Sequence, residues 1–193
     1  RPDCQSIFGL AREVAAALGQ PLKTPALDYT ETEVEKEGFE VTVDAQDLCP
    51  RYIAHYVYDV KLGQSPAWMR RRLALVGNNS ISNIVDITNY IMRELGQPLH
   101  AFDCNFLEGN AIQVRRASEG EKIVTLDEKE FTLNPNNLVI CDGKKPVALA
   151  GIMGGLNSEI RDTTTEVMFE SAKFARDNIR RSSRALGQSS DAS

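Results

Sequence analysis

The order of the predicted elements indicates an α+β fold. Helical periodicity dominates residues 1–100, short strands separated by turns fill residues 110–170, and one basic helix follows. Because strands and helices do not alternate regularly, a doubly wound parallel sheet is disfavoured. The 193 residues contain neither an internal repeat nor a low-complexity linker, so we expect a single compact domain over residues 1–193.

Three helices are predicted in the first half of the chain. Apolar residues recur at spacings of three and four from Asp3 to Leu18, and Gly19 ends that helix. Ser65-Pro66 supplies an N-cap residue and a first helical residue for a helix that stops at Gly77. Isoleucines at helical spacing predict a third helix over residues 83–95.

Strand patterns occur before and after these helices. Residues 39–44 alternate between apolar and polar, as in a half-buried strand, whereas residues 51–62 are apolar on both faces and predict a central strand. Residues 96–103 are expected to form a loop. The later predicted strands are Ile112–Ala117, Lys122–Leu126, Glu130–Leu133, Leu138–Cys141, Val147–Ile152 and Glu166–Glu170. A basic helix over Ala172–Leu186 follows, ending at Gly187.

Composition narrows the class of protein. There are 22 basic and 27 acidic residues, a net charge of −5, so nucleic acid would be contacted through local patches, at residues 70–72 or at Arg180, Arg181 and Arg184. No apolar run reaches the ~18 residues of a membrane helix, so we expect no membrane contact. The four cysteines are widely spaced, which favours reduced, buried thiols, no metal site and a cytoplasmic protein.

A polar pocket is suggested by a few residues near the strands. Residues 150–155 form a Gly-x-x-Gly-Gly motif that is neither a dinucleotide fingerprint nor a P-loop. Paired glycines allow close backbone approach to a ligand, although a structural bulge explains them equally well. Glu170 ends an apolar strand and would need a partner or a pocket if buried, and His100 lies in the predicted loop. No nucleophilic triad can be assembled.

An ordered set of motifs resembles a known family. These motifs are Arg1-Pro2-Asp3-Cys4, Val85-Asp86-Ile87-Thr88-Asn89-Tyr90, Gln97-Pro98-Leu99-His100-Ala101-Phe102-Asp103, Ala150-Gly151-Ile152-Met153-Gly154-Gly155 and Ser190-Asp191-Ala192-Ser193. Together they resemble the B3/B4 region of the bacterial phenylalanyl-tRNA synthetase β subunit over essentially the whole chain. The resemblance implies a three-layer (β/β/α) sandwich, and both ends are expected to continue into a longer subunit.

The resemblance also implies a function. The family's enzyme is a cytoplasmic (αβ)₂ heterotetramer that joins phenylalanine to its tRNA with ATP and Mg²⁺, both bound outside this region. The B3/B4 region removes tyrosine wrongly attached to the 3′ end of the phenylalanine tRNA. By resemblance, the residues near the ester and the terminal adenosine are His100, Asn89 and Thr88. The residues that would bind the substrate are Glu170, Gly154, Gly155, Pro98, Ser190 and Ala192.

These roles have a chemical logic. Glu170 could accept a hydrogen bond from the tyrosine hydroxyl, while an N–H of Gly154 or Gly155 donates to the same oxygen. Pro98 would shape the wall and Ala192 would set the pocket size. The sequence departs from the family pattern at residues 77–79, where Gly-x-Arg is expected, and Ser190 replaces a common threonine. The alternative is a scaffold of the heterotetramer that lines the tRNA path and no longer edits; a free-standing small-molecule hydrolase is weaker.

Overall fold

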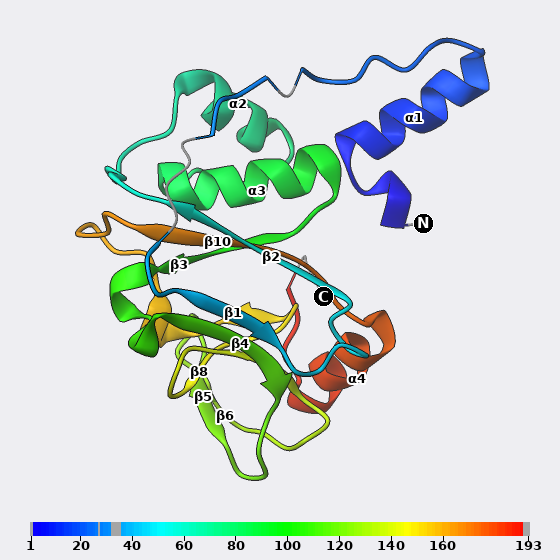
Figure 1. Cartoon of the computed structure of the whole chain (residues 1–193). Helices are drawn as coiled ribbons and strands as arrows, with labels where there is room; N and C mark the ends of the chain where they lie inside the picture. Colours follow the sequence, from blue (N-terminus) through cyan, green and yellow to red (C-terminus); the bar gives the residue numbers. More distant parts are fainter. Residues whose placement is uncertain (1, 27, 32–35, 191–193) are drawn as a thin grey trace. The chain divides into compact units, whose positions relative to one another are not determined.

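The computed structural model describes residues 2–26, 28–31 and 36–190, which belong to two compact units (Figure 1). The first unit comprises residues 1–36 and 63–99, and the second comprises residues 37–62 and 100–193. Helices and mostly antiparallel sheets occur together, which confirms the predicted α+β class. The single domain over residues 1–193 stays a prediction.

The first unit is helical in its described part. Its elements are the 3-10 turn η1 (Pro2–Cys4) and the helices α1 (Ile7–Leu18), α2 (Ala67–Leu75) and α3 (Asn83–Leu95). The first helix begins later than predicted, because the Ser6 side chain accepts the Gly9 N–H and caps it there. Gly19 ends it in the left-handed conformation, as predicted.

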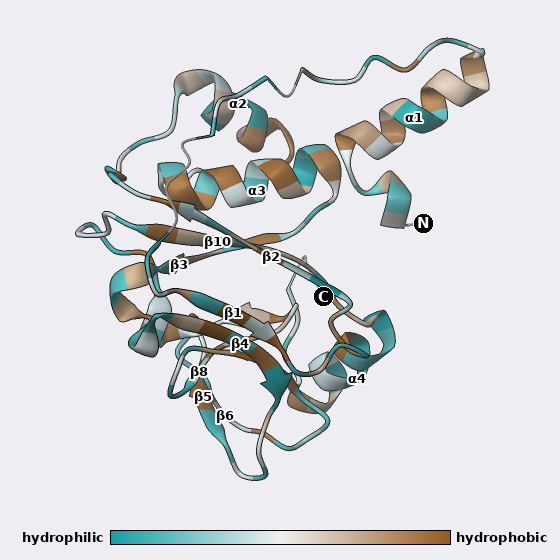
Figure 2. Ribbon diagram, viewed as in Figure 1, coloured by the Kyte–Doolittle hydropathy of each residue, from teal (hydrophilic) through white to brown (hydrophobic). Residues whose placement is uncertain are grey.

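The second and third helices begin differently. Ser65 is not the N-cap of α2, because Pro66 occupies that position and the Ser65 hydroxyl donates to Asp86 instead. The α3 boundaries agree with the prediction: Ser82 caps its start and Gly96, in the left-handed conformation, its end. Brown and teal segments alternate along α3 in Figure 2, as its amphipathic sequence requires.

The described part of the second unit contains three sheets. The five-stranded sheet has the order β1 (Glu40–Val43), β4 (Ala111–Arg116), β7 (Leu138–Cys141), β8 (Pro146–Leu149), β9 (Met153–Gly154). The three-stranded sheet has the order β2 (Arg51–Val57), β10 (Val167–Lys173), β3 (Leu99–Asp103), and β5 (Lys122–Val124) pairs with β6 (Glu130–Thr132). The 3-10 turns are η2 (Cys104–Phe106), η3 (Glu108–Asn110) and η4 (Leu156–Ser158). β1 and β4 pair in parallel, whereas the pairs β2–β10, β4–β7, β5–β6, β7–β8 and β8–β9 are antiparallel.

Three expectations about these elements were wrong. β2 lies at an edge of its sheet, and the central strand is β10. Residues 99–103 form β3 rather than part of a loop, because they join the far side of β10, a long-range partner that local sequence does not reveal. β10 also continues through Lys173, so the last helix, α4, spans Arg176–Leu186 and does not start at Ala172.

The second unit is layered around two apolar cores. Side chains alternate across β7, so that Ile140 joins one core while Val139 and Cys141 join the other. The first core packs the five-stranded sheet against the three-stranded one and includes Phe102 and Met168. The second packs the opposite face of the five-stranded sheet under α4. This unit alone is therefore a sheet–sheet–helix stack.

No helix in the described ranges combines the length and apolar character needed to cross a bilayer.

Candidate functional site

Glu170 is a carboxylate placed in the layer between two sheets. Alternate residues of a strand share a face, so Glu170 points to the same side as Met168, a member of the apolar core. Glu170 is only 6% exposed. Burial raises the pKa of Glu170 to about 7, although a hydrogen bond from Tyr52 lowers it in part. Near neutral pH this side chain is therefore divided between acid and carboxylate.

Tyr52 is the partner of Glu170 that sequence reasoning missed. The Tyr52 Oη donates to Glu170 Oε2 over 2.9 Å. Tyr52 lies opposite Ala172 on β10, so it reaches Glu170 as a diagonal neighbour. Among the described residues, nothing donates to Glu170 Oε1. The sequence contains a buried-strand tyrosine and a carboxylate that could bond each other, but only the β2–β10 register shows that Tyr52 and Glu170 meet.

His100 faces the same layer from β3. It shares a face with the fully buried Phe102, and the two rings meet edge to face with centroids 4.6 Å apart. The imidazole also lies directly against Gly154: a Cβ on that glycine would come within 2.3 Å of the His100 Cε1 and 2.7 Å of its Nε2. Burial lowers the pKa of His100 to about 4. At neutral pH the ring is therefore uncharged, with one nitrogen able to accept a hydrogen bond.

The paired glycines of the Gly-rich motif, Gly154 and Gly155, have different local roles. Gly154 leaves space for His100 and accepts the Leu126 N–H through its carbonyl. The Gly155 N–H donates to the Val147 carbonyl over 2.7 Å, so it is not available to a substrate oxygen as predicted. Because successive N–H groups of a strand point to opposite sides, the Gly154 N–H is directed away from β8. Of the two N–H groups predicted to donate to the substrate oxygen, that of Gly155 is bonded to β8 and that of Gly154 is not.

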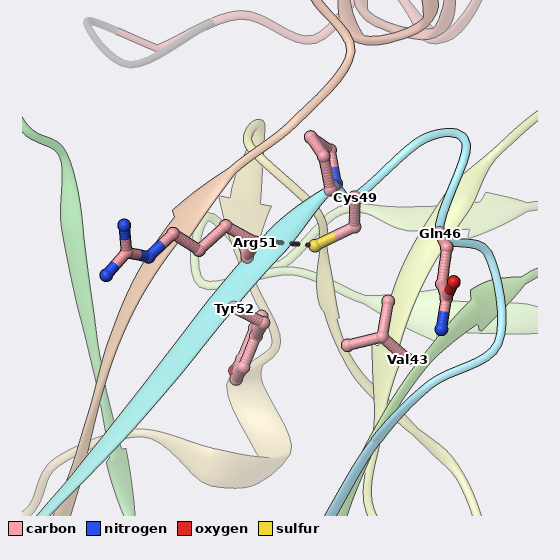
Figure 3. A pocket seen from close by; sticks show the side chains of 6 residues that line it. Val43, Gln46, Cys49, Arg51 and Tyr52 are labelled. Atoms are coloured by element: carbon pink, nitrogen blue, oxygen red, sulfur yellow. Dashed lines mark hydrogen bonds between the residues drawn. The ribbon is translucent and has the colours of Figure 1, made fainter.

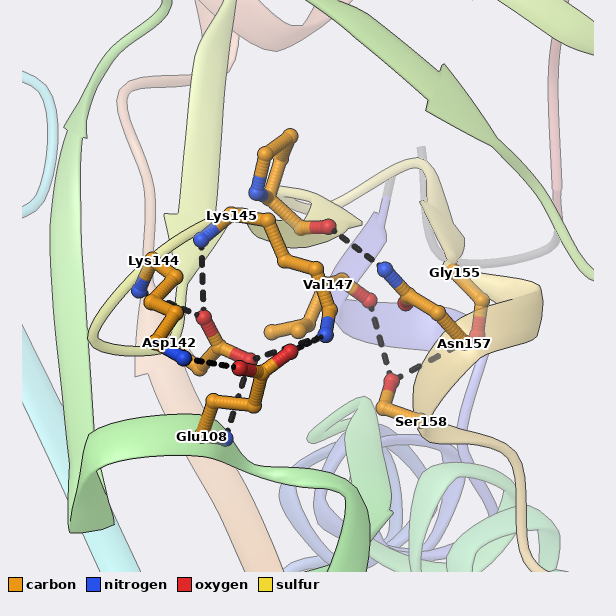
Figure 4. A network of polar contacts seen from close by, with 9 residues as sticks. Glu108, Asp142, Lys144, Lys145, Val147, Gly155, Asn157 and Ser158 are labelled. Carbon is orange, nitrogen blue, oxygen red and sulfur yellow. Dashed lines mark hydrogen bonds and ion pairs between the residues drawn. The ribbon is translucent and has the colours of Figure 1, made fainter.

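Local packing explains Gly155. A Cβ there would lie 2.5 Å from the Val147 carbonyl oxygen and 2.7 Å from the Asn157 Oδ1, so only glycine fits. Figure 4 shows the surrounding contacts, in which the Ser158 hydroxyl donates to the Val147 carbonyl over 3.2 Å. At Gly155 the glycine is therefore explained by local packing, the structural alternative to close approach of a ligand.

The rest of the network in Figure 4 fixes the turn after β7. Asp142 is buried and accepts the backbone N–H groups of Glu108, Lys144 and Lys145. Lys144 and Lys145 both pair with the Glu108 carboxylate, which lowers the pKa of Glu108 to about 2. This carboxylate stays ionised and satisfied, so the cluster holds a corner of the five-stranded sheet.

The segment that leads to Ser190 is held by Gln188. The Gln188 side chain is buried; its Nε2 donates to Asp127 Oδ2 and its Oε1 accepts from Lys129 Nζ, both over 3.1 Å. Asp127 and Lys129 lie in the turn between β5 and β6, whose Leu126 also bonds Gly154. This turn therefore connects the chain before Ser190 to the glycine that touches His100. Ala192 lies outside the described residues.

Thr88, Asn89 and Pro98 belong to the first unit. The Thr88 hydroxyl donates to the Val85 carbonyl over 2.7 Å, which commits its proton to the α3 backbone. Asn89 is half-buried one residue further along α3, and Pro98 is half-buried before β3. The predicted roles of Thr88 and Asn89 near the ester and of Pro98 in the pocket wall stay predictions.

A buried aspartate organises that helical unit. Asp86 is fully buried and accepts hydrogen bonds from the Ser65 and Ser80 hydroxyls and from the Ile81 N–H. Burial alone would raise the pKa of Asp86, but these bonds and the charge of Arg70 outweigh burial and lower it. Asp86 thus joins the segments before α2 and before α3 to one point of α3.

A cavity of about 490 Å³ opens beside the β1–β2 connection (Figure 3). Its lining residues are Val43, Gln46, Cys49, Pro50, Arg51 and Tyr52. Glu170 is not among them, so this cavity is not the pocket in which Glu170 is predicted to accept the tyrosine hydroxyl. The Cys49 thiol is directed to the Arg51 carbonyl, and burial beside the negative Glu170 raises the pKa of that thiol to about 11.

The buried thiols are poor nucleophiles. All four cysteines are reduced, as predicted. Burial raises the pKa of Cys141 to about 12, and Cys49 is similarly raised, so both remain protonated at neutral pH. Neither thiol therefore supplies a thiolate nucleophile near neutral pH.

Comparison with known proteins identifies the class. A family model described as the B3/4 domain matches residues 48–193, so the chain belongs to the B3/4 domain family. Over its whole length the chain is 57% identical to the phenylalanine–tRNA ligase beta subunit of Syntrophus aciditrophicus and 53% identical to that of Moorella thermoacetica. It spans about a quarter (24%) of each of those subunits.

A solved structure supports the same fold. The chain aligns with an N-terminal fragment of the phenylalanyl-tRNA synthetase beta subunit from Pyrococcus horikoshii at a TM-score of 0.53. That alignment covers 98% of this chain and 59% of the other, at 16% identity, so the likeness concerns the fold alone. The resemblance drawn from the motifs is confirmed.

Proposed function

We propose that this chain is the editing part of a phenylalanine–tRNA ligase beta subunit, where it hydrolyses tyrosine wrongly esterified to the phenylalanine tRNA. The observation that carries the proposal is the buried Glu170 carboxylate between the sheets. Burying a carboxylate in that layer costs stability, and the hydrogen bond from Tyr52 offsets this cost at Oε2. Glu170 Oε1 is suited to accept the hydroxyl of a tyrosyl ring.

Selection of tyrosine would follow from that acceptor. Phenylalanine lacks the hydroxyl, so its entry would leave Glu170 Oε1 without a donor. A site that binds a substrate hydroxyl can discriminate against the analogue without it by ~10⁴–10⁵-fold. In the full ligase, this hydrolysis would remove tyrosine that the tight apolar synthetic site attaches to the tRNA in place of phenylalanine.

The hydrolytic step requires little from the protein. An aminoacyl ester is already activated, so a positioned water and the terminal ribose hydroxyl of the substrate could suffice. The uncharged His100 imidazole, held between Gly154 and Phe102, would orient that water. Thr88 and Asn89 would position the ester and the terminal adenosine, Pro98 would shape the pocket wall, Ser190 would bind the substrate and Ala192 would set the pocket size.

The proposal extends to the assembly. The chain would act within an (αβ)₂ heterotetramer with the α subunit, which charges the tRNA using ATP and Mg²⁺ bound outside this region. It would receive the 3′ end of the tRNA in the cytoplasm.

The scaffold alternative is favoured by one contact. Tyr52 already satisfies Glu170 Oε2, so Glu170 could be a buried carboxylate with only an internal partner. In that case the region would line the tRNA path without catalysing hydrolysis.

Deacylation of Tyr-tRNA and Phe-tRNA by the intact two-subunit enzyme separates these functions. We expect the unaltered enzyme to hydrolyse Tyr-tRNA rapidly and to spare Phe-tRNA. Glu170→Ala should abolish the difference, whereas Glu159→Gln, on the exposed surface, should keep it. Equal, slow hydrolysis of both substrates by all three proteins would establish the scaffold. Full activity of His100→Ala would remove the role given to His100.

A further inference from the structure

The structure distinguishes two basic patches that the sequence alone leaves equivalent. α2 carries Arg70, Arg71 and Arg72, and α4 carries Arg176, Arg180, Arg181 and Arg184. Within α2, Arg72 donates to the Tyr90 hydroxyl over 2.6 Å and lies over the Trp68 ring. Arg70 is half-buried, and its charge acts on Asp86. Two of the three α2 arginines are therefore used inside their own unit.

The arginines of α4 are used differently. Asn178 and Ser182 both bond the Asn136 carbonyl, and Ile179 packs into the core, so this face of the helix is fixed inward. Arg180, Arg181 and Arg184 are exposed, and no described acidic residue forms an ion pair with any of them. Four arginines against one aspartate give α4 a net charge of +3 in a chain whose net charge is −5.

A second concentration of positive charge lies at the strand that leads into α4. Lys173, the last residue of β10, stands directly opposite Arg51 of β2. Both side chains are exposed, and no described carboxylate pairs with either. Like charges directly opposite each other destabilise a sheet, so this pair is unexplained by packing and suits a bound anion.

We propose that Arg51, Lys173, Arg180, Arg181 and Arg184 form one basic surface that binds the phosphodiester backbone of RNA. The guanidinium groups on α4 suit phosphate, because each offers several donors in a planar fork. Arg180 and Arg184 are one turn apart on the same side of the helix, about 6 Å along its axis. The inference rests on the proposed function, in which the RNA is the substrate tRNA.

The surface also has a consistent place in the second unit. It continues along the chain from the C-terminal end of β10, which carries Glu170, through α4 to Gln188, which holds the segment before Ser190. RNA held by Lys173 and the α4 arginines would be bound by the same continuous stretch of chain that supplies Glu170 and Ser190, two of the predicted substrate-binding residues.

The test is equilibrium binding of uncharged tRNA to the intact two-subunit enzyme between 50 and 200 mM salt. Each lost phosphate contact lowers the salt slope by roughly 0.7 to 0.9. The triple variant R180Q/R181Q/R184Q should therefore lower the slope by about 2 and weaken binding by roughly tenfold or more at 0.1 M salt. R51Q/K173Q should lower the slope by more than one. R180K/R181K/R184K, which keeps the charge, should retain most of the affinity, and R71Q on α2 should change nothing.

Two results would overturn the inference. One is an unchanged salt slope in R180Q/R181Q/R184Q when its thermal unfolding matches that of the unaltered enzyme. The other is loss of subunit assembly with normal tRNA affinity, which would make the surface a protein interface. Because uncharged tRNA is used, failure of the editing proposal would leave binding intact and abolish only the Tyr-tRNA discrimination.

Discussion

Removal of the Tyr52 hydroxyl tests how the buried carboxylate is controlled. In Tyr52→Phe, Glu170 loses the 2.9 Å hydrogen bond to Oε2 while the ring stays in place. That bond favours the ionised carboxylate, so its loss should raise the pKa of Glu170 further above its present value of about 7. A hydrogen bond contributes about 1.5–3 kcal/mol to a charged group and about 0.5–1.5 kcal/mol to a neutral one, and the difference of roughly 1–1.5 kcal/mol corresponds to a rise of about one pKa unit.

The same change predicts a pH-dependent loss of stability. At pH 8.5, where Glu170 is largely ionised, Tyr52→Phe should lower the free energy of unfolding by about 1.5–3 kcal/mol. At pH 5 the neutral acid makes a weaker bond, and the loss should fall to about 0.5–1.5 kcal/mol. The sign follows because the hydroxyl stabilises the charged form, which is populated only above the pKa of Glu170.

The assay is urea unfolding of the chain at both pH values, together with a carbon-13 NMR titration of its glutamate carboxyls. Tyr58→Phe is the matched control, because Tyr58 lies beyond the end of β2 and is not bonded to Glu170. An unchanged or lowered Glu170 pKa in Tyr52→Phe would refute the reasoning, as would an equal loss of stability at pH 5 and pH 8.5.

Three further predictions concern neighbouring groups. Gly154→Ala should displace the His100 ring, because the new methyl group would lie 2.3 Å from the His100 Cε1. The pKa of His100, followed by proton NMR titration, should then rise from about 4 toward that of an exposed imidazole. An unchanged His100 pKa would contradict this contact. Glu170→Gln should reveal a pH trend that Glu170 offsets in the unaltered chain: protonation of Glu170 stabilises the folded chain by roughly 3 kcal/mol as pH falls from about 7 to about 4.5, whereas His100, with its lowered pKa, destabilises it by a similar amount as pH falls from about 6.5 to about 4. In urea unfolding the variant should retain only the His100 trend, so an unchanged pH profile would count against the Glu170 shift. Asp86→Ala should leave three hydrogen-bond donors without an acceptor and lower the free energy of unfolding by about 3 kcal/mol or more. Asp162→Ala, at an exposed position, is the control. A loss below about 1 kcal/mol would show that water replaces the Asp86 carboxylate.

The comparison of sequence with structure shows which signals are local. The α3 boundaries agree exactly, because both caps lie in the sequence next to the apolar stripe. β7 was equally clear, since a short apolar run was bounded by turn residues on both sides. Ser65 was misassigned as a cap because the acceptor that takes its hydroxyl, Asp86, lies 21 residues away.

The candidate site was predictable in composition and not in arrangement. Glu170 and His100 were selected as chemically suitable residues, and the motif order indicated their family. Tyr52 was missed because its meeting with Glu170 depends on the antiparallel register of two strands separated by more than a hundred residues. Gly155 was given a donor role that the Val147 carbonyl already occupies, a contact made only when β8 and β9 pair.

The sequence by itself determined the α+β class, most helices and strands, the reduced cysteines and the family, because periodicity, capping and motif spacing are properties of neighbouring residues. The tertiary structure alone decided which polar groups form hydrogen bonds within the protein and which remain available to a ligand. Strand register turned Tyr52 toward Glu170, close packing placed His100 against Gly154, and the inward face of α4 left Arg180, Arg181 and Arg184 exposed. These outcomes depend on contacts between distant segments, and burial and hydrogen bonding are fixed only once those segments pack together.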